Sequence, residues 1–138
     1  MIIVSACLAG IKCRYDGKSN SCLPVIDLVR EGKAIPLCPE QLGGLSTPRV
    51  PAEIVNGRVI SKEGIDVDLQ FSNGAEETLR IAKLIGAKMA ILKQRSPSCG
   101  STKIYDGSYS GKIILGRGKT AQLLADNGIK IISEEELD

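Results

Sequence analysis

Five cysteines are the residues of this chain that could carry the most chemistry, and three of them share one setting in the sequence. Cys7 and Cys38 each follow a short apolar run directly, and Cys99 lies in the polar loop 94–101 behind a third apolar run. Thiolates are soft ligands that select zinc, cuprous copper or iron–sulfur clusters. If the three runs are neighbouring strands, the thiols meet in space and can share one metal centre.

The chain contains no histidine, and this absence restricts the chemistry that the thiols can join. It excludes Cys-His proteolysis, Ser-His-Asp hydrolysis and zinc sites that contain histidine. No C-x-x-C pair occurs either, so the usual pattern of a closed zinc site is absent. Cys13 is open to three interpretations: a thiol near the ligands, an occasional ligand or a buried residue. We assign no role to Cys22, which precedes a predicted helix.

The composition indicates one compact domain, residues 1–138, with an aliphatic core. Hydrophobic residues make up 43% of the chain and aromatic residues 3%, and the net charge is +2. Near-neutral charge and scarce aromatics disfavour a nucleic-acid surface. No apolar run approaches the roughly 20 residues of a membrane span, and no basic segment precedes the apolar start. We therefore expect a cytoplasmic protein with reduced thiols and no membrane contact.

Strands and helices are predicted to alternate along the chain. Short apolar runs predict buried strands at 1–6, 34–38, 88–93 and 129–132. Helical spacing and stop signals predict helices at 24–32, 75–85 and 120–127, with Asn73 as a cap for the second. The Asn56-Gly57 pair predicts a small β-hairpin at 52–61, and turn residues suggest another ribbon at 105–114. We expect an α/β fold with a mostly parallel open sheet flanked by helices.

These elements would position the three thiols. Ligands of open parallel sheets bind outside the carboxyl ends of the strands, so the loops with Cys7, Cys38 and Cys99 should converge on one crevice. The segment 39–49, rich in glycine and proline, is expected to be a loop rather than the interior of an element. It places the carboxylate of Glu40 beside a thiol.

Several motifs in order resemble the domain-of-unknown-function 523 family over nearly the whole chain. The motifs are Ser5-Ala6-Cys7-Leu8-Ala9-Gly10, Cys13-Arg14-Tyr15-Asp16-Gly17, Cys38-Pro39-Glu40, Gly43-Gly44-Leu45-Ser46-Thr47-Pro48-Arg49, residues 64–67 and Ser96-Pro97-Ser98-Cys99-Gly100. Members of that family include thiouracil desulfidases. The resemblance implies a 4Fe-4S cluster held by three cysteines, here Cys7, Cys38 and Cys99, with the fourth iron open.

The resemblance also implies a reaction, namely non-redox desulfuration of a thiouracil-like base or a small thioamide. The open iron would act as a Lewis acid toward the thiocarbonyl sulfur and accept it, while water adds to the carbon. Without histidine, Glu40 is the best-placed general acid/base. It could instead stabilise the start of a helix after Pro39. A serine of the Cys99 loop is expected to assist, with Ser96 preferred over Ser98, although serines beside proline are also common turn residues.

Two alternatives remain open at this stage. The cysteines could belong to a cytosolic metal- or redox-sensing module, with Cys7 and Cys13 as the redox pair. The enzyme could also act on thiolated tRNA. The near-neutral charge and the scarcity of aromatic residues favour a small thiolated base over tRNA.

Overall fold

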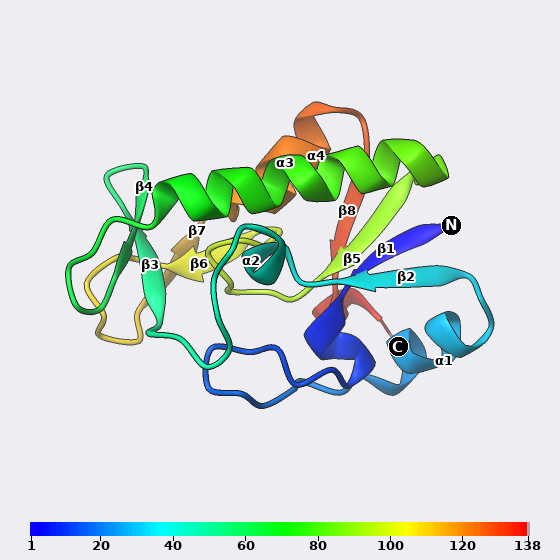
Figure 1. Cartoon of the computed structure of the whole chain (residues 1–138), viewed down its shortest axis with the longest axis horizontal. Coiled ribbons are helices and arrows are strands. Elements are labelled where there is room, and N and C mark those ends of the chain that lie inside the picture. Colours follow the sequence, from blue (N-terminus) through cyan, green and yellow to red (C-terminus); the bar gives the residue numbers. More distant parts are fainter. Residues whose placement is uncertain (138) are drawn as a thin grey trace.

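A four-stranded parallel sheet forms the centre of the protein (Figure 1). The computed structural model describes residues 1–137, and residue 138, the end of the predicted domain, lies outside this range. The strands in spatial order are β2 (Ala34–Leu37), β1 (Ile2–Ser5), β5 (Met89–Leu92) and β8 (Lys130–Ser133). All three pairings between them are parallel. The predicted α/β fold with a parallel open sheet is confirmed.

Helices cover both faces of the sheet. They are α1 (Leu23–Arg30), α3 (Asp68–Ile85) and α4 (Lys119–Asp126). Ile3 and Leu92 pack in the cluster that includes α3 and α4, while Val4 and Ile91 pack in the cluster that includes α1. Successive side chains of a strand point to opposite faces, so aliphatic runs fill both halves of the core. Within residues 1–137, no helix combines the length and apolar character needed to cross a membrane.

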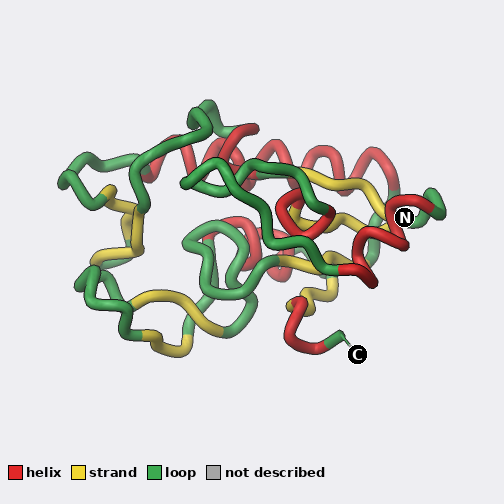
Figure 2. The backbone as a smooth tube through the Cα atoms, turned by 90° about the horizontal axis from the view of Figure 1, so that it is seen from below, coloured by secondary structure: helices red, strands yellow, loops and turns green. Residues whose placement is uncertain are grey.

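Two antiparallel ribbons lie together at the end of the molecule away from the N-terminus (Figures 1 and 2). One joins β3 (Ala52–Val55) to β4 (Arg58–Ser61), and the other joins β6 (Lys103–Tyr105) to β7 (Ile113–Leu115). The first ribbon turns at Asn56 and Gly57, which both have positive φ, as the turn of a tight hairpin requires. The hairpin predicted at 52–61 is confirmed with the same bounds, and the ribbon predicted at 105–114 is confirmed with slightly wider bounds.

The start of α3 differs from the prediction. The helix begins at Asp68, so Asn73 lies inside it and does not cap it. Gly74, next to the predicted cap, lies inside the helix and permits a close approach between backbones. A Cβ atom added at Gly74 would lie 1.9 Å from the carbonyl oxygen of Pro39, and one added at Gly43 would lie 1.9 Å from that of Gln70. The two glycines thus bring the Cys38 segment against α3.

A short helix, α2 (Pro39–Leu42), begins directly after Cys38, where the sequence predicted a loop. Pro39 occupies the first turn, where its missing N–H costs no hydrogen bond, and Glu40 is the acidic residue of that turn. The predicted alternative for Glu40, at the start of a helix after Pro39, is confirmed. A helix start and a role in chemistry are compatible for this carboxylate.

Replacing Gly74 by alanine is expected to lower the free energy of unfolding by about 2 kcal/mol, the usual cost of overpacking. Alanine has a higher helix propensity by about 1 kcal/mol, but the clash with the Pro39 carbonyl outweighs this gain because a backbone must move. Guanidinium titration of the metal-free protein measures the change. The control is Glu76→Ala, at an exposed position of the same helix. If the Gly74→Ala variant were as stable as the wild type, α2 and α3 could move apart without a loss of stability, and the prediction would be wrong.

Candidate active site

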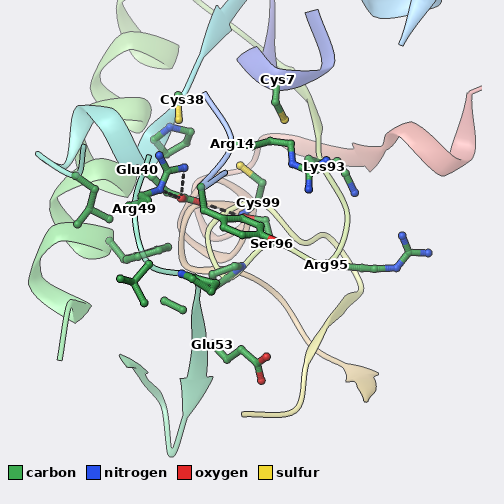
Figure 3. Close-up of a pocket in the computed structure, with 18 of the residues that line it drawn as sticks. Cys7, Arg14, Cys38, Glu40, Arg49, Glu53, Lys93, Arg95, Ser96 and Cys99 are labelled. Atoms are coloured by element: carbon green, nitrogen blue, oxygen red, sulfur yellow. Dashed lines mark hydrogen bonds and ion pairs between the residues drawn. The ribbon is translucent and has the colours of Figure 1, made fainter. Parts of the chain in front are cut away.

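The three predicted cysteines lie around one cavity of about 590 Å³ (Figure 3). In the sheet, β1 lies between β2 on one side and β5 on the other, so the strand order reverses direction at β1. Such a reversal of strand order opens a crevice at the carboxyl ends of the strands. Cys7 follows β1 in a 3-10 helix (Ala6–Ala9), Cys38 follows β2, and Cys99 lies in the loop after β5. The predicted convergence of the three loops is confirmed.

Burial raises the pKa of the Cys7 thiol and of the Cys99 thiol, because a buried thiolate loses its hydration. Hydrogen bonds with Asn20 at Cys7 and with Ser5 at Cys99 oppose this effect and are weaker. Negative charge on Cys38 raises both pKa values further. The three sulfur atoms therefore share one electrostatic environment, in which a bound cation would stabilise their ionised forms.

Cys13, which sequence reasoning left open, lies against Cys38 rather than forming a pair with Cys7. A hydrogen bond from the Cys13 thiol lowers the pKa of Cys38 to about 7, assisted by the backbone N–H of Gln41 and opposed by burial. The same bond, together with burial, raises the pKa of Cys13. The Cys38 thiol, while protonated, can also donate to the Cys13 carbonyl oxygen, which lies 3.8 Å from its Sγ. Cys38 is thus the thiol of the site that ionises most readily.

Soft thiol donors of this kind suit an iron–sulfur cluster. Among residues 1–137, no group of three or more His, Cys, Asp or Glu side chains is close enough to hold one ion. A cluster needs no such contact, because each thiolate binds a different iron and the ligands stand apart. Cys7, Cys38 and Cys99 supply three soft donors around a cavity of small-molecule size.

Glu40 and Ser96, both predicted to assist, meet at this cavity (Figure 3). The Ser96 hydroxyl accepts hydrogen bonds from the backbone N–H groups of Ser98 and Cys99, each at 3.0 Å. Its own proton is left to donate to Oε1 of Glu40, at 3.4 Å. Arg49 donates to the other carboxylate oxygen, Oε2, from Nε at 2.7 Å. The loop of one candidate ligand and the helix of another are thereby joined through a hydroxyl–carboxylate pair.

Comparison with known proteins identifies the family. The model of the 2-thiouracil desulfurase family matches residues 2–136. The chain belongs to this family. It is 48% identical to a protein of Bacillus subtilis (strain 168) described as uncharacterized protein YbbK, over all of this chain and 98% of that protein. It also resembles the solved structure of the 4Fe-4S-dependent thiouracil desulfidase TudS (DUF523Vcz), with a TM-score of 0.94 and 46% identity, over 99% of this chain and 91% of that one.

In this member of the 2-thiouracil desulfurase family, the two serines of the Cys99 loop have different surroundings. Ser96 lines the cavity. Ser98 is fully buried outside it, and its hydroxyl lies 2.8 Å from that of Thr120 on α4. Ser98 therefore anchors the loop to the helix layer, and Ser96 is the serine of the pair that faces the cavity.

Gln94, two residues after β5, holds the Cys99 loop in shape, a role that sequence reasoning missed. Its side chain is buried, and Oε1 accepts hydrogen bonds from three consecutive backbone N–H groups, those of Ser101, Thr102 and Lys103, at 2.9, 3.1 and 3.0 Å. Its Nε2 donates to the hydroxyls of Ser101 and Thr102. One feature of the sequence could have indicated this role: Gln94 directly follows a predicted buried strand, and a buried amide side chain needs hydrogen-bond partners.

Changing Gln94 to alanine is expected to lower the free energy of unfolding by about 3 kcal/mol, because three N–H groups lose their acceptor. Chemical denaturation of the metal-free protein checks this value. Gln122→Ala is the matched control, since Gln122 is exposed and bonds only to Asp126 of its own helix. If both alanine variants lost the same small amount, Gln94 would not support the loop.

Two further residues at the cavity were not assigned from the sequence. Arg49 belongs to a quoted motif but received no role, and Lys93 was treated only as the end of a strand. Lys93 Nζ lies 3.0 Å from Glu134 Oε2, and its positive charge lowers the pKa of Cys7. Both cations line the cavity beside candidate ligands. Only the folded chain brings them there, since Arg49 is eleven positions from Cys38 in sequence.

Proposed function

We propose that the protein is an iron–sulfur-dependent desulfidase that removes sulfur from a thiolated nucleobase such as thiouracil. The observation that carries this proposal is the meeting of three cysteines, one carboxylate and one serine at a single cavity. Membership of the 2-thiouracil desulfurase family and the likeness to the 4Fe-4S-dependent enzyme TudS support it.

Cys7, Cys38 and Cys99 would hold a 4Fe-4S cluster as thiolates, leaving one iron without a protein ligand. When bound, the cluster would supply a Lewis-acidic iron that accepts the thiocarbonyl sulfur without net redox change. The low pKa of Cys38 assists its ionisation at neutral pH. Burial of Cys99 keeps solvent from that side of the site.

The residues of the chain would handle the protons of a hydrolysis. In the overall reaction, a carbon–sulfur double bond and water become a carbon–oxygen double bond and hydrogen sulfide, so atoms and electrons balance without a reductant. Glu40 is the group that takes a proton from the attacking water, at Oε1, because Oε2 is bound to Arg49. The Ser96 hydroxyl, which donates to Oε1, orients this oxygen and links it to the Cys99 loop.

The size of the cavity favours a small substrate. About 590 Å³ lies within the range of small-molecule sites, and it must hold the cluster as well as the substrate. A free thiolated base or a small thioamide fits this description. Thiolated tRNA would have to present its base from outside, and it serves as the comparison substrate in the test.

The test is anaerobic turnover of the reconstituted protein in ¹⁸O-labelled water without a reductant. With 2-thiouracil we expect uracil and sulfide in equal amounts and one ¹⁸O atom in each uracil. No sulfide release would refute the desulfidase proposal, and uracil without the label would refute hydrolysis. Faster turnover of thiolated tRNA than of the free base would reassign the substrate.

A further inference from the structure

Arg49 is the most completely bonded cation of the site. Of the five N–H donors of a guanidinium group, four make hydrogen bonds in Arg49: one from Nε, one from Nη2 and two from Nη1. Nε donates to Oε2 of Glu40 at 2.7 Å, and Nη2 lies in ion-pair contact with the same oxygen at 2.5 Å. Nη2 also donates to the Cys13 carbonyl at 2.9 Å, and Nη1 donates to the Ser46 carbonyl at 3.2 Å and the Thr47 hydroxyl at 2.9 Å. All three nitrogens of the guanidinium therefore have a hydrogen-bond acceptor, and together these acceptors fix its orientation.

This arrangement distinguishes the two oxygens of the Glu40 carboxylate. The hydrogen bond and the ion-pair contact from Arg49 both fall on Oε2, so Oε1 remains for the Ser96 hydroxyl and for a substrate or water in the cavity. The Arg49 side chain is 9% exposed and that of Glu40 is 16% exposed, so water screens the pair weakly. A free carboxylate would rotate and exchange its two oxygens.

The arginine also ties together segments that carry the candidate ligands. Its backbone N–H donates to the Tyr15 carbonyl at 2.8 Å, and its side chain reaches the Cys13 carbonyl. The same Cys13 carbonyl oxygen lies 3.8 Å from Sγ of Cys38, two residues before Glu40. Arg49 thus links the carboxylate of Glu40 to the Cys13–Tyr15 segment, which lies far from it in sequence.

We propose that Arg49 is the positioning residue of the reaction, which fixes Glu40 with Oε1 directed at the reacting atoms. The inference rests on the proposed desulfidase function. Lysine cannot replace arginine in this role, because an ammonium group has three donors around one nitrogen and cannot reach all four acceptor groups. Charge alone would be conserved by lysine, whereas the orientation of the carboxylate would be lost.

The first test is the Arg49→Lys variant after anaerobic reconstitution. We expect the iron content of the wild type, nearly unchanged KM for 2-thiouracil and about 100-fold lower kcat, as for a displaced catalytic group. Arg58→Lys is the matched control, because Arg58 is exposed and pairs with Asp66 away from the cysteines. Wild-type kcat, or loss of iron from the Arg49→Lys variant, would overturn the proposal.

A double-mutant cycle with Glu40→Gln separates positioning from general support of the fold. If Arg49 acts through Glu40, Arg49→Lys costs less than about 3-fold in kcat when Glu40 is already glutamine. A structural role would give the same 100-fold loss in both backgrounds and would refute positioning. Should the lysine variant fail to fold, Thr47→Val, which removes one acceptor of Arg49, is expected to lower kcat in the same direction by a smaller factor. An unchanged kcat of that variant would count against the proposal.

A crystal structure of the Arg49→Lys variant makes the test independent of turnover. We expect Glu40 to rotate so that Oε1 no longer faces Ser96. If the wild type releases no sulfide but Glu40 rotates in the variant, the proposed function fails and the positioning by Arg49 stands. If the wild type is active and Glu40 keeps its orientation in the variant, the function stands and the positioning fails.

Discussion

Replacing Cys99 by serine is expected to abolish both cluster binding and turnover. An alkoxide is a harder and far more basic ligand than a thiolate, so serine is a poor ligand for iron in a sulfur-bound cluster. The residue is buried, and the loop around it is held by Gln94 and Ser96, so water cannot readily take the place of the lost ligand. Iron should fall from about four atoms per chain to less than one. Iron analysis and sulfide release from 2-thiouracil measure the two effects.

Cys22→Ser provides the matched control for this change. Cys22 precedes α1 and does not line the cavity, so its replacement should leave iron content and turnover close to those of the wild type. Full iron content in the Cys99→Ser variant would remove Cys99 from the ligand set. Equal iron loss in both variants would indicate a general effect of thiol removal on the fold.

Replacing Glu40 by glutamine should have the second largest effect, with turnover lower by about 10²- to 10⁴-fold and iron content unchanged. Glutamine has the same shape, and its carbonyl oxygen can still accept the hydrogen bonds of Arg49. Its amide nitrogen cannot take up a proton at the position of Oε1. The cluster should therefore form normally while proton transfer fails. Single-turnover sulfide release, normalised to iron, is the measurement.

The control for Glu40→Gln is Glu76→Gln, which neutralises an exposed carboxylate on α3 far from the chemistry in sequence. It should turn over at the wild-type rate. Loss of iron from the Glu40→Gln variant would make Glu40 a structural support of the Cys38 segment. Wild-type turnover with full iron would remove it from the proton transfers.

The sheet was predictable because its strands are short aliphatic runs that no other element competes for. The order of the strands in the sheet could not be predicted from the individual runs. The rule that ligands bind at the carboxyl ends of parallel strands was nevertheless sufficient to predict that the three thiols meet. The start of α3 was placed too late because Asn73, a residue typical of helix caps, lies inside the helix next to Gly74. The contact of Gly74 with the Pro39 carbonyl depends on α2, which local sequence did not predict.

Site residues could be predicted when they lie in the same loop as a candidate cysteine ligand. They could not be predicted when their partner comes from a segment distant in sequence. Glu40 and Ser96 were expected beside Cys38 and Cys99, and the structure brings them together. The choice between Ser96 and Ser98 required the position of Thr120 on α4. The contact of Arg49 with Glu40 likewise follows from the path of the chain and not from spacing.

The dependence of sulfide release on iron tests the central claim most directly. One anaerobic preparation should be divided into fractions reconstituted to different iron contents, and each should be given 2-thiouracil without a reductant. We predict that the initial rate of sulfide release rises in proportion to the fraction of chains carrying a full cluster and is absent from the iron-free fraction. Sulfide release by iron-free protein, or none from fully loaded protein, would contradict a cluster-dependent desulfidase.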